Sequence, residues 1–217
     1  WFAPALECVY TPLTPEEVVA CVQDALSTYG RDVKVVSGRH CYEGFAYNES
    51  TRAIIDMSGL GDAGYAADRG AYFVDAGAEN WTAYRSLLNG YGVTLPAGSC
   101  YSVGAGGHIS GGGFGLLSRL HGLTIDHVTG IDVVTWDAAT STARLRYVSE
   151  SSNDPDERDL FWALRGAGGG NYGVITRFWF ADLPVAPAWA SLWHAAWDWS
   201  QFNERSFTQL VARFADL

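Results

Sequence analysis

The sequence predicts an α+β fold in which helices and short strands alternate along the chain. Three observations support this class. The sequence has a capped amphipathic helix near its start, short β-branched runs after that helix, and, later in the chain, two strand patterns joined by a turn. The chain has 217 residues, and 48% of them are hydrophobic. This length and composition allow one large domain, or one domain and part of a second.

The first helix is predicted from Thr14 to Tyr29. Thr14 is a capping residue, Pro15 takes the first helical position, Glu17 completes a capping box, and Gly30 ends the pattern. Strands and helices follow in alternation. We expect strands at residues 32–37, 53–57, 71–77 and 173–180, helices at 80–92 and 156–167, and two strands about a turn at 129–149.

A stretch with two prolines, "DLPVAPAW" at residues 182–189, is the best candidate for a domain boundary. We therefore expect a first domain over residues 1–187 and the start of a second over residues 188–217. In the second, residues 190–200 are predicted to form a strand and residues 203–217 a helix. No cap or breaker follows this helix, so we expect the second domain to continue further.

The charge balance limits the possible partners. The chain carries 24 acidic and 14 basic residues, a net charge of -10. This charge argues against nucleic acid or an anionic membrane surface, and it favours small neutral or polar ligands. Lys34 is the only lysine, which excludes Walker-type phosphate binding. No run approaches the ~20 apolar residues of a membrane span.

The cysteines do not predict a metal site. Cys8, Cys21, Cys41 and Cys100 lack the paired short spacings of zinc ligands, and four are too few for a disulfide scaffold at this length. Cys8 and Cys21 are expected to be dispensable for catalysis, and whether they pair with each other stays open.

Two glycine-rich stretches stand out. The first, "GSCYSVGAGGHISGGGFG" at residues 98–115, is either a surface loop or a backbone cradle for an anion such as pyrophosphate, and we favour the cradle. The second, "GGGNYG" at residues 168–173, matches GxGxxG, but a helical pattern precedes it and a strand follows. A nicotinamide-binding fold needs the reverse order, so it is not expected.

His40 lies in a third stretch, "KVVSGRHCYEGF", at residues 34–45. From the residues alone, it could be a core histidine, a metal ligand, a general base or a covalent cofactor tether. The stretches "VVSGRHCYEGF", "LPAGSCYSVGAGGHISGGGFGLLSRLHGL" and "DLFWALRGAGGGNYGVIT" occur together in the order and spacing of the berberine bridge enzyme-like flavoprotein oxidases. The chain resembles this family up to Pro187, and it is most similar to the bacterial oxidases that tailor sugars on antibiotics.

This resemblance implies a PCMH-type FAD-binding domain of two α/β subdomains, followed by a substrate domain with a large antiparallel sheet. It also implies that FAD is bonded through its 8α-methyl to His40 and through carbon 6 to Cys100. An imidazole and a thiolate are nucleophiles suited to an electron-poor flavin. The other residues implied to bind the cofactor are Ser37, Gly38, Arg39, Val103, Gly104, Gly106, Gly107, His108, Ser110, Gly111, Gly112 and Gly113, with Gly173 and Val174 near the adenine.

Three side chains near these motifs allow alternatives. Arg39, where many relatives have glycine, either pairs with a phosphate or points to solvent. Cys41 is expected to be a small core residue, because it points away from the tether if the segment is extended. His108 either bonds the flavin or stabilises its own loop, and we favour the loop.

The resemblance implies an oxidase that moves a hydride from a sugar alcohol or hemiacetal carbon to the flavin and reduces O2 to hydrogen peroxide. The substrate expected is a hexose hydroxymethyl group on a glycosylated natural product such as a glycopeptide. A tyrosine base is expected beyond residue 217. The alternatives are a flavin dehydrogenase, an oxidative cyclase acting on a non-sugar compound, or a non-catalytic carbohydrate-binding relative. A bacterial cytoplasmic location is expected, with secretion as the alternative, and the oligomeric state stays open.

Overall fold

The computed structural model describes residues 4–216 and divides the chain into two compact units. The first ends at Ala186, and the second begins at Pro187.

A small parallel sheet opens the first unit. Its strands are β1 (Cys8–Tyr10), β2 (Val33–Val36) and β3 (Ala53–Asp56), in the spatial order β1-β3-β2. Helix α1 (Pro15–Tyr29) crosses from β1 to β2, as a parallel connection requires. The Thr14 side chain accepts a hydrogen bond from the Glu17 amide at 3.2 Å, so the predicted cap is confirmed. The expected capping box is not formed, because the Glu17 carboxylate accepts from the Leu13 amide at 2.7 Å and not from the Thr14 amide.

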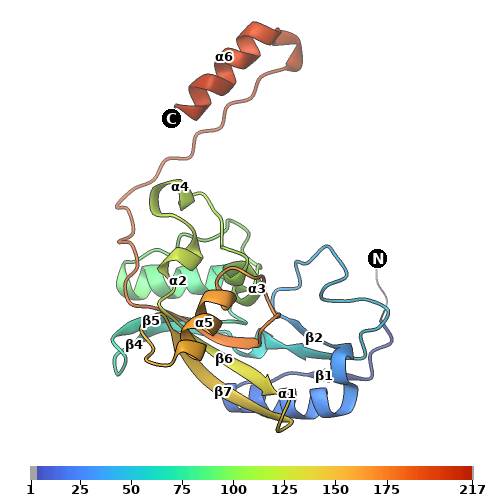
Figure 1. Ribbon diagram of the computed structural model, residues 1–217. Helices are drawn as coiled ribbons and strands as arrows, with labels where there is room; N and C mark the ends of the chain where they lie inside the picture. The colour runs from blue at the N-terminus through green and yellow to red at the C-terminus, as the bar shows by residue number, and fades with distance from the viewer. Residues whose placement is uncertain (1–3, 217) are drawn as a thin grey trace. The chain divides into compact units, whose positions relative to one another are not determined.

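A larger antiparallel sheet has the order β4-β5-β8-β6-β7. Its strands are β4 (Ala63–Ala66), β5 (Ala71–Asp75), β6 (Gly130–Asp137), β7 (Thr142–Ser149) and β8 (Val174–Phe180). Helices α2 (Asn80–Tyr91), α3 (Ala105–Ser110) and α5 (Pro155–Leu164) lie over one face of this sheet in Figure 1, while the short α4 (Ser118–His121) lies further out. The main core fills the space between these helices and the sheet, with Leu87, Ile109 and Phe178 at most 1% exposed.

Helix α1 packs against both sheets. Its buried face, with Val18 and Val22, forms a second core cluster with Ile55 of the small sheet and Val134 of the large one. The amphipathic pattern of α1 therefore joins the two α/β parts into one unit. The α+β class is confirmed.

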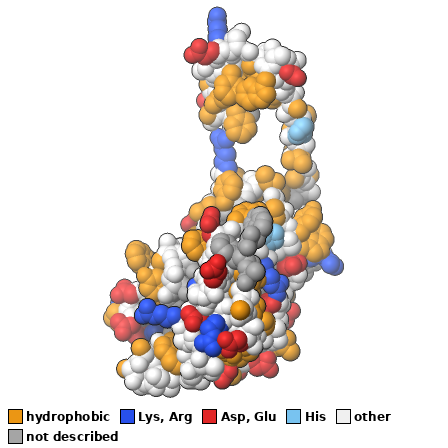
Figure 2. Space-filling view, turned by 90° about the vertical axis from the view of Figure 1, so that its right-hand side faces the viewer, with side chains coloured by type: hydrophobic (Ala, Val, Ile, Leu, Met, Phe, Trp, Pro, Cys, Tyr) orange, Lys and Arg blue, Asp and Glu red, His pale blue; other side chains and the backbone are white. Residues whose placement is uncertain are grey.

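The second unit contains α6 (Glu204–Ala215), as predicted, but its predicted strand is wrong. In residues 190–200 the backbone is irregular and ends in a 3₁₀ turn at Trp199–Gln201. A strand needs a neighbour to pair its amides and carbonyls, and the described residues of this unit form no sheet. Trp193 is 90% exposed, and Figure 2 shows hydrophobic side chains on the surface of this unit.

Within residues 4–216, no helix has the length and hydropathy to cross a membrane.

Candidate cofactor site

The candidate site begins where the small sheet ends. β2 and β3 are parallel, and Val36 pairs with Asp56 at their carboxyl ends. The segments that leave these two strands therefore start at the same edge of the sheet. Ser37, the first residue after β2, donates a hydrogen bond from its hydroxyl to the Ala76 carbonyl at 2.6 Å, just beyond β5. This bond ties the segment of His40 to the larger sheet.

The stretch that contains His40 meets the first glycine-rich stretch at a contact between Gly38 and Gly104. An ideal Cβ on Gly38 would lie 2.2 Å from the Gly104 nitrogen, and one on Gly104 would lie 2.0 Å from the Ser37 hydroxyl oxygen. Any side chain at either position would clash with its neighbours, so both glycines are needed for close backbone approach. The Gly106 amide donates to the Ala76 carbonyl at 2.7 Å, which fixes the start of α3 at the same junction.

The two candidate tethers lie on these neighbouring segments. The Nε2 atom of His40 lies 3.0 Å from the Ser102 hydroxyl oxygen, and the Cys100 carbonyl accepts a hydrogen bond from the Asn80 side chain at 3.1 Å. The imidazole of His40 and the thiol of Cys100 are both exposed, and the thiol is free. Both side chains can therefore be reached by a ligand that lies across the junction.

Arg39 has a partner within the protein that neither expected alternative included. Its guanidinium pairs with the Asp56 carboxylate, which is 10% exposed and also accepts a hydrogen bond from the Ser58 amide. The φ angle of Arg39 is 60°, a left-handed value that is uncommon for a residue other than glycine. The carboxyl end of β3 thus supplies a carboxylate partner for Arg39.

Cys41 is not a core residue. Its side chain is exposed, and its sulfur donates to the Glu43 carbonyl at 3.3 Å. The prediction failed because it assumed an extended backbone around His40, whereas Arg39 turns the chain at this point.

His108 stabilises its own loop. Its Nε2 accepts a hydrogen bond from the Gly98 amide at 2.8 Å, and burial lowers the pKa of the imidazole below its usual value. A neutral ring is what this bond requires, since Nε2 must carry a lone pair. The contact joins the start of the first glycine-rich stretch to α3 and supports the loop role.

The first glycine-rich stretch is an ordered part of the fold. Ile109 is 1% exposed, and the Thr124 hydroxyl donates to the Gly113 carbonyl at 3.0 Å. Gly112 and Gly113 have φ angles of 108° and 75°, which favour glycine at the turn after α3. Gly107 differs, because it is exposed and nothing lies within 4 Å of an ideal Cβ there. It is the position in α3 at which a ligand can approach the backbone most freely.

The second glycine-rich stretch joins the same region. An ideal Cβ on Gly169 would lie 2.9 Å from the Ser110 hydroxyl oxygen, so this stretch packs against the end of α3. Gly173 has a φ angle of 152° and leads into β8, where Val174 pairs with Val134. The stretch follows α5 and precedes a strand, which is the reverse of the dinucleotide fingerprint, as predicted.

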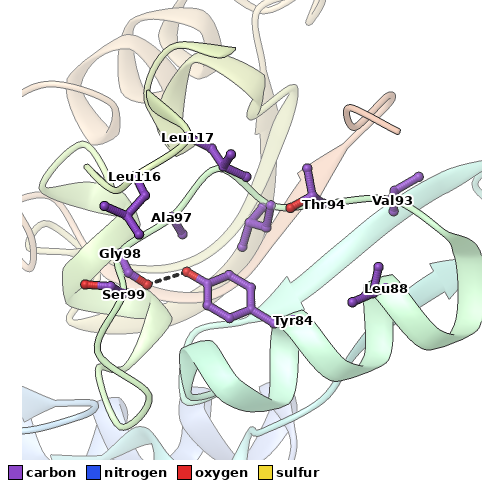
Figure 3. Close-up of a pocket in the computed structure, with 10 residues that line it drawn as sticks. Tyr84, Leu88, Val93, Thr94, Ala97, Gly98, Ser99, Leu116 and Leu117 are labelled. Atoms are coloured by element: carbon purple, nitrogen blue, oxygen red, sulfur yellow. Dashed lines mark hydrogen bonds between the residues drawn. The ribbon is translucent and has the colours of Figure 1, made fainter. Parts of the chain in front are cut away.

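A pocket that the motifs did not predict lies beside Gly98 and Ser99 (Figure 3). Its volume is about 270 Å³, and its walls include Leu88, Leu116 and Tyr84. The Tyr84 hydroxyl donates to the Gly98 carbonyl at 2.5 Å, and burial raises the pKa of this tyrosine to about 12. Tyr84 therefore holds the loop and is poorly suited to act as a general base.

The geometry fits a flavin nucleotide. Glycines bring backbone segments together, Gly107 is exposed on α3, and the two nucleophilic side chains of His40 and Cys100 are exposed on the segments that meet at Gly38 and Gly104. The chain belongs to the FAD-binding domain family, whose model matches residues 6–143.

Known oxidases are similar over almost the whole chain. A hexose oxidase from Chondrus crispus is 41% identical over 100% of this chain and 40% of its own length. An aclacinomycin-N/aclacinomycin-A oxidase from Streptomyces galilaeus is 39% identical over 94% of this chain and 39% of its own. A glycopeptide hexose oxidase complexed with teicoplanin superposes with a TM-score of 0.86 at 32% identity, over 97% of this chain and 44% of that one. The chain thus spans about 40% of the length of these two curated relatives.

Proposed function

We propose that this chain holds the flavin of a FAD-dependent oxidase that acts on a sugar. The reaction moves a hydride from an alcohol or hemiacetal carbon and ends with the reduction of O2 to hydrogen peroxide. When bound, FAD supplies the hydride acceptor and passes the electrons on. The observation that carries the proposal is the junction at Gly38 and Gly104, which brings the segments of His40 and Cys100 together.

We propose that His40 and Cys100 are the two covalent tethers. Both side chains are exposed and nucleophilic, and they lie on segments joined by the bond between His40 and Ser102. Two attachments would hold the ring in one orientation, which reduces the freedom that is lost when substrate and flavin come together.

The backbone around the junction would receive the rest of the cofactor. The segments that contain the other proposed binding residues converge on α3, with Gly107 open to a ligand and Gly169 packed near Ser110. The Gly106 amide already bonds Ala76, so Gly106 would contribute close approach rather than a hydrogen bond.

The proposed substrate is a hexose hydroxymethyl group on a glycosylated natural product. The similarity to a hexose oxidase and to a glycopeptide hexose oxidase supports this choice. The general base is proposed to be a tyrosine outside these 217 residues, and the engaged hydroxyl of Tyr84 agrees with that placement.

Two experiments on the whole protein test the proposal. Flavin should stay with acid-precipitated wild-type protein, should persist after His40→Ala or Cys100→Ala alone, and should be lost after both. Wild-type flavin in the supernatant would contradict the tethers.

A screen of sugars, glycosides and glycopeptides should then give oxygen uptake with at least one sugar. Turnover only with artificial acceptors would indicate a dehydrogenase instead.

A further inference from the structure

The hydroxyl of Ser102 contacts the proposed histidine tether directly. It lies 3.0 Å from Nε2 of His40, across the junction between the two motifs. Ser102 is two residues before Gly104, and His40 is two residues after Gly38. Each residue is therefore the same distance along its segment from the contact between Gly38 and Gly104, and the two face one another.

The position of this bond distinguishes the two nitrogens of the imidazole. A neutral imidazole has one N–H donor and one nitrogen with a free lone pair, and the partner of one nitrogen fixes the state of the other. If Nε2–H donates to the Ser102 oxygen, the lone pair lies on Nδ1. Only that nitrogen is then able to act as a nucleophile.

We infer that Ser102 is a positioning residue for flavin attachment, which holds Nε2 of His40 and presents Nδ1 to the cofactor. This inference rests on the proposed tether at His40 and extends it to the residue that controls the attachment. The hydroxyl of Ser102 is not itself a nucleophile here, because it acts through the orientation and tautomer of the ring.

The scaffold supports a fixed geometry for this bond. The glycine contact leaves no space between residues 38 and 104, and the Ser37 hydroxyl bonds the Ala76 carbonyl at 2.6 Å. On the other side, the Asn80 side chain bonds the Cys100 carbonyl at 3.1 Å. Both segments are therefore held before a ligand arrives, which is the condition for a hydroxyl to orient the ring effectively.

Attachment of the flavin to His40 is a two-electron oxidation, and dioxygen is the oxidant. A bond forms between Nδ1 and the methyl carbon, one methyl C–H bond and the imidazole N–H bond are lost, and the two hydrogens with their electrons reduce O2 to hydrogen peroxide. The ring proton leaves from Nε2 to water and is one of the two that end in hydrogen peroxide, while the Ser102 oxygen only accepts a hydrogen bond from this nitrogen before the proton leaves.

The test uses the whole protein with Cys100→Ala, so that His40 carries the only link. The apoprotein is mixed with FAD in air, and flavin on the tryptic peptide of residues 40–52 is followed by mass spectrometry. Adding Ser102→Ala should slow this attachment about tenfold, the loss expected for one hydrogen bond at the transition state. Ser102→Thr keeps the hydroxyl and should restore the rate to within about twofold, while the control Ser99→Ala should leave it unchanged.

The attached nitrogen gives a second readout. Nuclear magnetic resonance of the isolated peptide should show the flavin on Nδ1 in the Cys100→Ala protein. A link through Nε2, or an unchanged rate in a folded Ser102→Ala variant, would overturn the inference while leaving the tether intact. A wild-type protein with no flavin on residues 40–52 would overturn the tether and the inference together.

Discussion

Gly104 in the first glycine-rich stretch and Gly170 in the second are required for different physical reasons. Around Gly104, the first stretch lies so close to another backbone segment that a Cβ would be 2.0 Å from a neighbouring atom. In the second stretch, Gly170 has nothing within 4 Å of its Cβ position, but its φ angle is 77°. The first requirement concerns space and the second concerns conformation. Substitutions should therefore have different costs in the two regions.

The largest effect is expected for Gly104→Ala. The methyl group would meet the Ser37 hydroxyl and the Gly38 backbone, and backbone cannot move without opening the junction. We expect a loss of about 3 kcal/mol in the free energy of unfolding, and loss of flavin attachment. Urea denaturation and flavin content measure the two effects. Wild-type stability in this variant would show that the two segments are not in contact.

Smaller losses are expected in the second stretch. Gly173→Ala combines a φ angle of 152° with a contact of 2.7 Å to Val133, and should cost about 2 kcal/mol. Gly170→Ala has only the φ penalty and should cost about 1 kcal/mol. Urea denaturation of the two variants gives the comparison, and equal losses would refute the distinction between space and conformation.

The pH dependence of stability should include a contribution from His108. Burial lowers the pKa of this histidine from its usual 6.5, so the unfolded chain binds a proton that the folded ring resists. Stability from this site is present above pH 6.5 and is lost as the pH falls below that value. The free energy of unfolding, measured by denaturation between pH 5 and 8, should decline less toward low pH in His108→Gln than in wild type. The exposed His194→Gln is the matched control, and identical profiles for both variants would contradict the assignment.

Arg39→Gly should have a small net effect. Glycine relieves the left-handed backbone by about 1 kcal/mol, while the lost pair with Asp56 contributes about 0–1 kcal/mol because the Arg39 side chain is 48% exposed. Arg39→Lys keeps the backbone cost and weakens the paired geometry, so it should be the less stable variant of the two. Thermal unfolding of both proteins decides between these contributions.

The smallest change in stability is expected for Gly107→Ala. Nothing lies near the added methyl group, and alanine favours the helix, so stability should rise by no more than about 1 kcal/mol. Flavin attachment should nevertheless slow, because Gly107 faces the proposed ligand. Gly166→Ala also has free space and serves as the control, with normal attachment expected. Equal attachment rates in the Gly107→Ala and Gly166→Ala variants would indicate that the cofactor does not lie against α3.

Strong local patterns made most of the fold predictable. The cap at Thr14 and the β-branched runs of β2 and β3 define elements without tertiary information. β1 has only three residues, and β4, with the sequence AGYA, contains no β-branched residue, so neither carries a pattern that predicts a strand. Helix α3 was missed because its glycines have low helix propensity and only packing stabilises it. The strand expected at residues 190–200 was wrong, since strand formation depends on a neighbour.

The site was predictable only in part. The motifs identified the segments of His40 and Cys100, but not the contacts between them. The roles of Ser102 and Asp56 depend on segments that meet through folding, and neither residue stands out in the sequence. Tyr84 carries no local signal either, because its importance comes from burial beside Gly98.

The most direct measurement asks whether one flavin joins the two motifs. Trypsin should release residues 40–52, which contain His40, and residues 86–119, which contain Cys100. Mass spectrometry of the digested wild-type protein should show both peptides cross-linked through a single flavin. Two unmodified peptides, or a flavin on only one of them, would contradict the account.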